Sequence, residues 1–546
     1  MSNYLTNNEA AEPAAGAKRR RKLWLVSGVA GLTGVVSLAA VGVATGAGAV
    51  GADGLRWATA QVSRDGDQGA DRGDQGRDRH DYDKDRDKDR DKDKDKKDHD
   101  DRAKEVPCDT DKLIQAIVFA NDNHGATLKL ADKCTYNLTR TDEYGNGLPV
   151  ITEDITLKGD DTKIVRDATA DYFRILNVGP GGHLTLKGLT IKGGQTLNRL
   201  MAPEPAAVWS AYSTSVETTA AATKAGKAVA VAPRTELKAV PKATPKGGVS
   251  TLVEEPGFND GAGILVQPGG TADLEHTEVV QNQSGGNGGG VANFGTTRIS
   301  KSTVTENTAF FFGGGIFNAG VLKVYESKVK DNEAGIGGGG IANGAAEIFT
   351  DDVDGGTVWV EKTEITGNKT IGFGGGILDI EGNTTVKHST ISHNTALVAG
   401  GGIAAAESSL NLYGVKVESN STVGVGGGLA IAFDSRATIE DSSIKDNVAA
   451  FFGAGLFNER SITVLRKSEV VGNRAVGPIG IGGGIFNVAG QVNLDKTKVA
   501  HNFSTLPPGG IFTTNSGVII DDKSAVTANR PTNCLGSPAT PPNCFG

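Results

Sequence analysis

The hexapeptide Gly-Gly-Gly-Ile-Phe-Asn occupies residues 313–318 and recurs unchanged at residues 482–487. It is one instance of a glycine-rich segment followed by an apolar residue, and that apolar residue stands at positions 291, 316, 341, 377, 403, 429, 456, 485 and 511. Asparagine forms a second series, at positions 282, 307, 332, 368, 394, 420, 447, 473, 502 and 529. In eight of nine pairs the apolar residue follows its Asn at the same short interval, so both series belong to one repeat of about 26 residues.

The residues before each Asn alternate between apolar and polar, as in a half-buried β-strand. Three residues before the Asn stands Val or Ile in all ten repeats, and five residues before it stands Ser or Thr in nine of ten. The position six before the Asn holds charged residues or His, such as Lys301, Glu326 and His388. We expect the Val/Ile column to face the interior and the charged column to face water. Strands this short cannot bury a core alone, so successive repeats must stack.

These patterns predict an all-β fold, a right-handed parallel β-helix in which each coil pairs with the next at about 4.8 Å. One buried column should consist of Val304, Val329, Ile365, Ile391 and Ile444. The column beside it should consist of Asn307, Asn332, Asn368, Asn394 and Asn447. Stacked Asn side chains hydrogen-bond to one another along the axis of cross-β stacks, and we expect the same ladder here.

The repeat resembles the GGA(I/L/V) and FxxN repeats of the polymorphic outer membrane protein family, and more broadly those of secreted bacterial β-helix proteins. The resemblance covers about residues 257–530, and residues 313–318 and 482–487 carry it most clearly. It implies a passenger-like β-helix outside the cell. Members of that family generally end in a membrane barrel, but only a short segment up to Gly546 follows Asn529, so we do not carry over autotransport.

Residues 1–52 are expected to be a basic cytoplasmic tail followed by a signal peptide or membrane anchor. Five basic residues at 18–22 precede Leu23 to Ala52, a stretch without any charge that is long enough to cross a bilayer. The stretch also contains Ala47-Gly48-Ala49, a pattern that signal peptidase cleaves, so both fates stay open. Residues 53–104 are expected to be a disordered charged linker, because Arg64 to Lys104 holds 16 Asp and 14 Lys or Arg.

Residues 105–546 are expected to form the β-helix domain, with a low-complexity insertion at about 195–256. A helix over Asp109 to Asn121 should cap its first coil, because Leu113, Ala116, Ile117 and Ala120 share one helical face. The two ends of the solenoid lie too far apart for a disulfide to join them. The four cysteines should therefore pair within each end, as Cys108–Cys134 and Cys534–Cys544. Disulfides fit an extracellular protein.

The composition excludes some functions and leaves two open. The net charge of −8, with no basic patch interleaved with aromatics, argues against nucleic-acid binding. The sequence predicts no catalytic residues and no cofactor-binding motif. We therefore expect an extracellular surface or matrix-binding protein, whose partner is a polysaccharide or cell-wall component and which contacts the membrane only through its N-terminal segment. The alternative is a polysaccharide lyase or glycoside hydrolase, since β-helices also carry those activities.

One irregularity suggests a Ca²⁺ or glycan site. The interval from Ile341 to Asn368 is longer than the equivalent interval in neighbouring coils, such as Ile316 to Asn332, so an extra segment should bulge out of the coil. The bulge is acidic, and acidic residues follow the equivalent strand in the next two coils. Clustered carboxylates suit Ca²⁺. The hypothetical metal ligands are Asp352, Asp354, Asp379, Glu381 and Glu407. The alternative is a solvated acidic loop.

Overall fold

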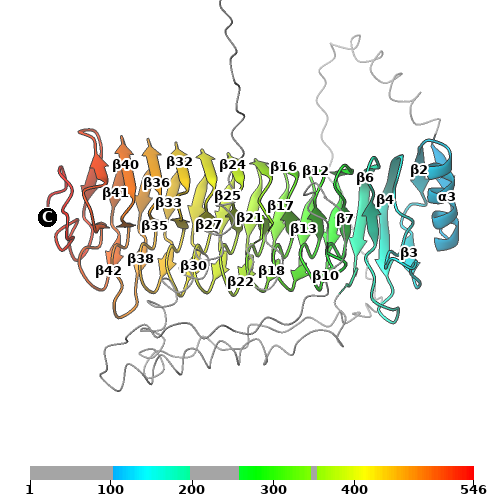
Figure 1. Ribbon diagram of the computed structural model, residues 1–546, viewed down its shortest axis with the longest axis horizontal. Coiled ribbons are helices and arrows are strands. Elements are labelled where there is room, and N and C mark those ends of the chain that lie inside the picture. Colours follow the sequence, from blue (N-terminus) through cyan, green and yellow to red (C-terminus); the bar gives the residue numbers. More distant parts are fainter. Residues whose placement is uncertain (1–102, 197–256, 346–352) are drawn as a thin grey trace, which may run out of the picture.

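A computed structural model describes residues 103–196, 257–345 and 353–546. They form a right-handed parallel β-helix of about 13 turns, with helix α3 at one end and the C-terminus at the other (Figure 1). All pairings between the named strands are parallel, as between β13 and β17 or β39 and β43. The predicted fold is confirmed. The expected export segment, most of the charged linker, nearly all of the insertion, and Asp352 lie outside the described residues.

The strands form three sheets that run the length of the solenoid. The long sheet has 25 strands: β1 (Lys104–Val106), β2 (Ala126–Leu130), β3 (Thr135–Leu138), β4 (Asp154–Arg166), β6 (His183–Lys192), β8 (Thr271–Glu275), β9 (Glu278–Val280), β12 (Thr296–Ser300), β13 (Thr303–Thr305), β16 (Val321–Tyr325), β17 (Lys328–Lys330), β20 (Thr357–Glu361), β21 (Glu364–Thr366), β24 (Asn383–Lys387), β25 (Thr390–Ser392), β28 (Ser409–Tyr413), β29 (Lys416–Glu418), β32 (Arg436–Glu440), β33 (Ser443–Lys445), β36 (Ile462–Arg466), β37 (Glu469–Val471), β40 (Gln491–Asp495), β41 (Lys498–Ala500), β44 (Val518–Ile520) and β45 (Ala525–Thr527).

The other two sheets are shorter. The nine-stranded sheet contains β10 (Gln283–Ser284), β14 (Thr308–Ala309), β18 (Glu333–Ala334), β22 (Lys369–Thr370), β26 (Thr395–Ala396), β30 (Ser421–Thr422), β34 (Val448–Ala449), β38 (Arg474–Ala475) and β42 (Phe503–Ser504). The eleven-stranded sheet contains β5 (Leu176–Val178), β7 (Ile264–Val266), β11 (Val291–Asn293), β15 (Ile316–Asn318), β19 (Ile341–Asn343), β23 (Ile377–Ile380), β27 (Ile403–Ala406), β31 (Leu429–Ala432), β35 (Leu456–Glu459), β39 (Ile485–Val488) and β43 (Ile511–Thr513).

Each coil turns at residues with a left-handed backbone. The position six before the repeat Asn, expected to face water, is one of these corners, with φ of 48° at Lys301, 46° at Glu326 and 47° at His388. The left-handed residue bends the chain between a five-residue strand and a three-residue strand of the long sheet. The Ser or Thr that follows points inward, and its hydroxyl bonds backbone across the corner, as Ser302 Oγ does to the carbonyl of Ser300 at 2.7 Å.

The interior consists of columns of like residues in register. Val304 pairs with Val329, Val329 with Ile365, and Ile365 with Ile391, and all four are fully buried. The predicted Asn ladder lies beside them. Asn368 Nδ2 donates to Asn394 Oδ1 at 3.0 Å, and the backbone N–H of Asn368 donates to the same oxygen at 3.0 Å. Each interior Asn thus hydrogen-bonds to buried polar groups of the neighbouring coils.

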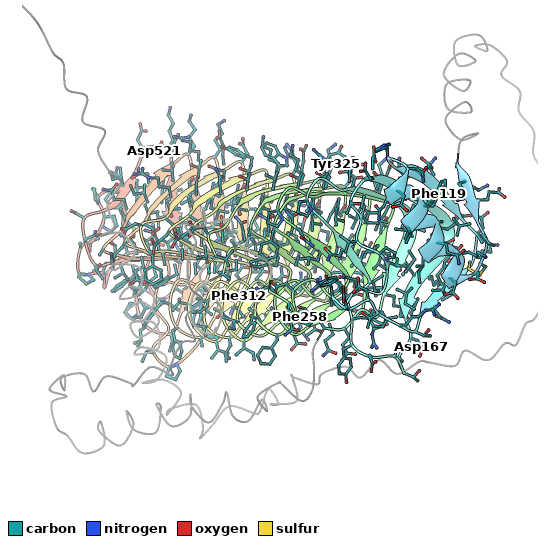
Figure 2. All side chains as sticks on the ribbon, turned by 45° about the vertical axis from the view of Figure 1, so that its right-hand side comes forward. Phe119, Asp167, Phe258, Phe312, Tyr325 and Asp521 are labelled. Atoms are coloured by element: carbon teal, nitrogen blue, oxygen red, sulfur yellow. A yellow bond between two sulfur atoms is a disulfide. The ribbon has the colours of Figure 1, made fainter. Side chains whose placement is uncertain are left out.

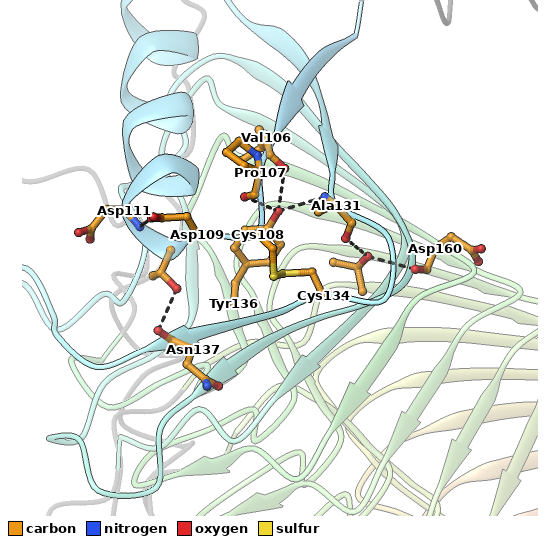
Figure 3. The surroundings of a disulfide bond; sticks show 12 residues. Val106, Pro107, Cys108, Asp109, Asp111, Ala131, Cys134, Tyr136, Asn137 and Asp160 are labelled. Carbon is orange, nitrogen blue, oxygen red and sulfur yellow. Dashed lines mark hydrogen bonds between the residues drawn. A yellow bond between two sulfur atoms is a disulfide. The ribbon is translucent and has the colours of Figure 1, made fainter.

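The first coil is capped by a helix, and each end is cross-linked by a disulfide, as predicted. Helix α3 (Thr110–Asp122) has Asp109 as its N-cap and buries the expected apolar face. Cys108–Cys134 ties the helix to the first coil, and Cys534–Cys544 closes the C-terminal segment. Beside the first disulfide, the Tyr136 hydroxyl lies 3.0 Å from both Val106 O and Pro107 O, which share its single proton (Figure 3). One boundary differs slightly, because Lys104, assigned to the linker, begins strand β1.

The insertion is also bounded a little differently. Gln195 and Thr196 belong to the ordered coil, since Thr196 N donates to Gln283 O at 2.9 Å, and the described chain resumes at residue 257. In the described ranges, no helix is long and apolar enough to cross a membrane, and Leu23 to Ala52 lies outside those ranges.

Candidate functional site

The predicted acidic site is only partly assembled. The bulge closes through an antiparallel bridge between Ala345 and Val353, and Gly355 N then donates to Ile380 O at 2.9 Å. Asp354 therefore lies next to the corner that carries Glu381. Glu381 and Glu407 occupy equivalent corners of consecutive coils, as predicted, because Glu381 N donates to Ala406 O. Asp352 lies outside the described residues.

Asp379 points away from the other predicted ligands. Its side chain is completely buried inside the solenoid, and its Oδ1 accepts from Asn343 Nδ2 at 2.9 Å. Within residues 103–196, 257–345 and 353–546, no group of three or more His, Cys, Asp or Glu side chains is placed to hold a metal ion.

The Ca²⁺ site stays a prediction, and calorimetry with Ca²⁺ tests it. If the corner carboxylates bind Ca²⁺, the full chain should release heat on titration, and Asp354→Ala/Glu381→Ala should abolish that heat because it removes a charge from each side of the site. Equal heats from wild type and double variant, or no heat from either, would overturn the site.

Asp379 ends a second ladder of interior amides that the sequence analysis did not identify. Asn293 Nδ2 donates to Asn318 Oδ1 and Asn318 Nδ2 to Asn343 Oδ1, both at 2.7 Å, and Asn343 then donates to Asp379. The next coil has Ala405 at this position, which offers no side-chain partner. A signal was available, because the Asn of Gly-Gly-Gly-Ile-Phe-Asn stands two residues after the apolar residue in several repeats.

Burial raises the pKa of Asp379 to about 7. Thr384, Asn343 and the backbone N–H of Gly382 oppose this shift. Only Asn343 among the side chains forms a full hydrogen bond, because Asp379 Oδ2 and Thr384 Oγ1 have no partner at hydrogen-bonding distance in the described part of the chain. Asp379 is therefore a structural carboxyl of the interior.

A different set of residues gathers on the outer face of the long sheet. Trp359 on β20 is 37% exposed, and Tyr325 on the preceding coil is 36% exposed. Tyr325 projects from the upper side of the solenoid (Figure 2). Two coils beyond Trp359, Tyr413 occupies the same strand position as Tyr325. We call Tyr325, Trp359, Lys362, Lys387 and Tyr413 the aromatic–lysine patch.

Lysines hold the rings of the patch in place. Lys387 Nζ lies 4.3 Å from the ring centroid of Trp359 and 5.5 Å from that of Tyr413. Lys362 Nζ lies 5.0 Å from the Tyr325 ring centroid and donates to its hydroxyl at 2.9 Å. Trp359 Nε1 donates to Glu361 Oε2 at 3.4 Å. These contacts orient the aromatic side chains before any ligand arrives.

No repeated residue type marks the patch in the sequence, although its residues stand at outward positions of the predicted columns. Tyr325, Lys387 and Tyr413 each stand seven residues before a repeat Asn, next to the column expected to face water. Trp359 stands nine before its Asn, at an outward position of the same strand. A Trp at an outward strand position was the available signal, because Trp side chains are on average highly buried.

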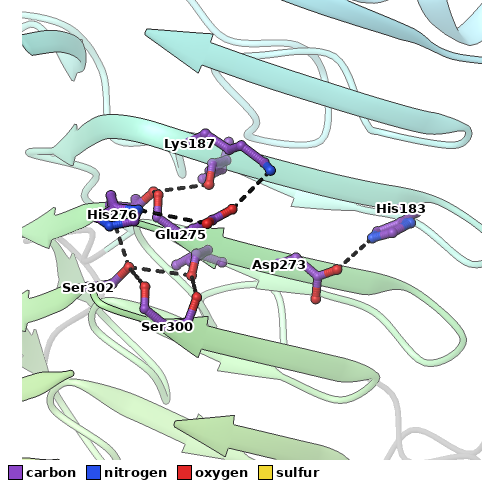
Figure 4. A network of polar contacts seen from close by, with 10 residues as sticks. His183, Lys187, Asp273, Glu275, His276, Ser300 and Ser302 are labelled. Atoms are coloured by element: carbon purple, nitrogen blue, oxygen red, sulfur yellow. Dashed lines mark hydrogen bonds and ion pairs between the residues drawn. The ribbon is translucent and has the colours of Figure 1, made fainter. Parts of the chain in front are cut away.

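A network of polar contacts borders the patch on its N-terminal side (Figure 4). His183 Nε2 lies 2.9 Å from Asp273 Oδ2, and Arg298 Nη1 lies 3.1 Å from Asp273 Oδ1. Lys187 pairs with Glu275 at 2.9 Å. Both Asp273 oxygens are thus engaged, and the contact with Asp273 positions Arg298 at the edge of the patch. The network contributes little to the free energy of unfolding, as is usual for exposed ion pairs.

The phenylalanines that precede the glycine-rich segments pack against the solenoid. Phe312 and Phe451 are buried, each within a side cluster that packs on the eleven-stranded sheet. Phe310 and Phe311 are half-buried and make an edge-to-face contact with each other at 4.9 Å. These rings pack beside the glycine-rich segments of the repeat.

The fold and its register define this chain as a right-handed parallel β-helix repeat protein. The family model described as "Right handed beta helix region" matches residues 340–504. Among solved structures, the chain is similar to the A-module of the mannuronan C-5 epimerase AlgE6 of Azotobacter vinelandii, with a TM-score of 0.35 and 12% identity over 76% of this chain and 95% of that one. None of the curated proteins matches the chain.

Proposed function

We propose that this protein is an extracellular, non-catalytic polysaccharide-binding β-helix of the cell surface or matrix, exported or anchored by residues 1–52. The aromatic–lysine patch is the observation that supports it. Trp359, Tyr325 and Tyr413 present apolar ring faces on a flat sheet, and the C–H face of a sugar ring stacks on such surfaces. The two disulfides are consistent with an oxidising compartment.

Hydrogen-bonding groups surround the rings, as a sugar ligand requires. Asn383 and Thr385 lie on β24, and Ser409 and Asn411 lie on β28. All four face outward, and each amide or hydroxyl can donate to or accept from sugar hydroxyls. Aromatic rings with polar groups around them combine the apolar and the hydrogen-bonding contacts that a sugar can make.

Trp359→Ala should weaken binding to an immobilised polysaccharide panel about tenfold, because a stacked ring contributes on the order of 1.4 kcal/mol. Glycan-array and calorimetric measurements on the full chain test this. Ile519→Ala is the matched control, since Ile519 is an exposed apolar residue at the equivalent strand position of β44.

Two outcomes would reject the proposal. If Trp359→Ala binds every glycan as tightly as Ile519→Ala does, the patch is not the binding site. If incubation with acidic and neutral polysaccharides releases new reducing ends or unsaturated products, the protein is a hydrolase or lyase.

A further inference from the structure

We propose that the aromatic–lysine patch selects a carboxylated polysaccharide and binds it along the solenoid axis, because unpaired lysines and aromatic rings alternate there over consecutive coils. This inference rests on the proposed function and names its ligand class. It depends on the register of the coils, on the charge of the face and on the position of Lys387.

The register lines up two columns on the outer face of the long sheet. In one column Arg298, Lys323 and Trp359 follow one another on β12, β16 and β20. In the other, Tyr325, Glu361, Lys387 and Tyr413 follow one another on β16, β20, β24 and β28. Consecutive members of a column lie about 4.8 Å apart, the spacing of paired strands. A polymer along the axis would therefore meet a new side chain at every coil.

The charge of this face differs from that of the chain. On strands β12, β16, β20, β24 and β28 and the corner residue after each, the outward side chains include five Lys or Arg and two Glu, a net charge of +3. The whole chain carries −8. A basic face on an acidic protein favours a polyanionic ligand.

Three of the five cations have no acidic partner in the described part of the chain. Arg298 pairs with Asp273 at 3.1 Å and Lys362 with Glu326 at 3.5 Å. Lys301, Lys323 and Lys387 make no ion pair with any described residue. Carboxylates of a ligand can therefore pair with these three ammonium groups without displacing a protein acid.

Lys387 couples the charge to the stacking surface. Its ammonium lies between the rings of Trp359 and Tyr413, as described above. A carboxylate bound at Lys387 would place its own sugar ring beside those aromatic faces. A sugar acid offers the carboxylate, the apolar ring face and the hydroxyls that this arrangement can bind. A neutral glycan lacks the carboxylate.

The experiment compares polygalacturonate with its fully methyl-esterified form, which has the same backbone without the charge. The full chain should bind the polyacid at least about tenfold more tightly at low salt, and this preference should shrink as salt screens it. Lys323→Gln/Lys387→Gln should remove most of the preference, whereas Lys498→Gln/Lys523→Gln, which changes two exposed lysines far from the patch, should keep it. Affinity should also rise with oligogalacturonate length until the chain spans β16 to β28.

The outcomes separate this inference from the proposed function. Equal binding of acid and ester, with Trp359→Ala weakening both, would overturn the charge selection and keep the glycan site. No effect of Trp359→Ala on either polymer would overturn both. Equal affinity for one galacturonate unit and for long oligomers would overturn the axial arrangement, and tighter binding of single-stranded oligothymidylate than of polygalacturonate would identify a different polyanion.

Discussion

Asn420→Ala should destabilise the β-helix by at least about 4 kcal/mol, because it leaves several buried polar groups without partners. Asn420 is fully buried in the first ladder. Its Oδ1 accepts from the backbone N–H and from Nδ2 of Asn394, each at 3.0 Å. Its Nδ2 donates to Ile391 O at 2.9 Å and to Asn447 Oδ1 at 3.0 Å. Alanine removes all four bonds and leaves their partners buried inside the solenoid.

Urea unfolding followed by circular dichroism measures the loss of stability, and hydrogen exchange shows which coils lose it. Exchange should quicken most in the coils that carry Asn394 and Asn447, since each coil of a solenoid contacts only its neighbours. Asn383→Ala is the control, because Asn383 is an exposed Asn on the outer face of β24. A loss for Asn420→Ala no larger than that for Asn383→Ala would show that the ladder does not stabilise the fold.

Asp379→Asn should remove a pH dependence of stability. The pKa of Asp379 is raised from 3.8 to about 7 in the folded protein, so the folded state holds a proton that the unfolded state releases between these values. The contribution of Asp379 to the free energy of unfolding is fully present below about pH 4 and is lost as the pH rises toward 7. A shift of about three units corresponds to about 4 kcal/mol. Above pH 7 the contribution should stay constant.

The variant has an amide where the wild type has an ionisable group, so it should be more stable than wild type at pH 8, and this advantage should vanish near pH 4. Unfolding midpoints of both proteins from pH 4 to pH 8 test this, because other titrating groups cancel in the difference. Asp441→Asn is the control, since Asp441 is exposed at a left-handed corner that Asn also tolerates. A constant difference between wild type and Asp379→Asn over this range would contradict the raised pKa.

The sequence by itself determined the solenoid and its register. A single repeat period carries the inward Val/Ile column, the first Asn ladder and the outward charged column. Each of these positions meets the same environment in every coil, so the same residue type recurs and the pattern can be counted along the chain. The disulfides followed from the same reasoning, because the length of the stack leaves only partners within each end.

Only the tertiary structure decided where Asp379 and the patch residues lie. The sequence placed Asp379 with Glu381 and Glu407, but strand alternation turns its carboxyl inward to Asn343 while the corners turn the others outward. Trp359, Lys387 and Tyr413 stand on different coils at outward positions, where solvent imposes no repeated residue type and no period reveals them. Their contact arises because parallel pairing brings residues from successive repeats side by side on one face, which depends on register and side-chain direction together.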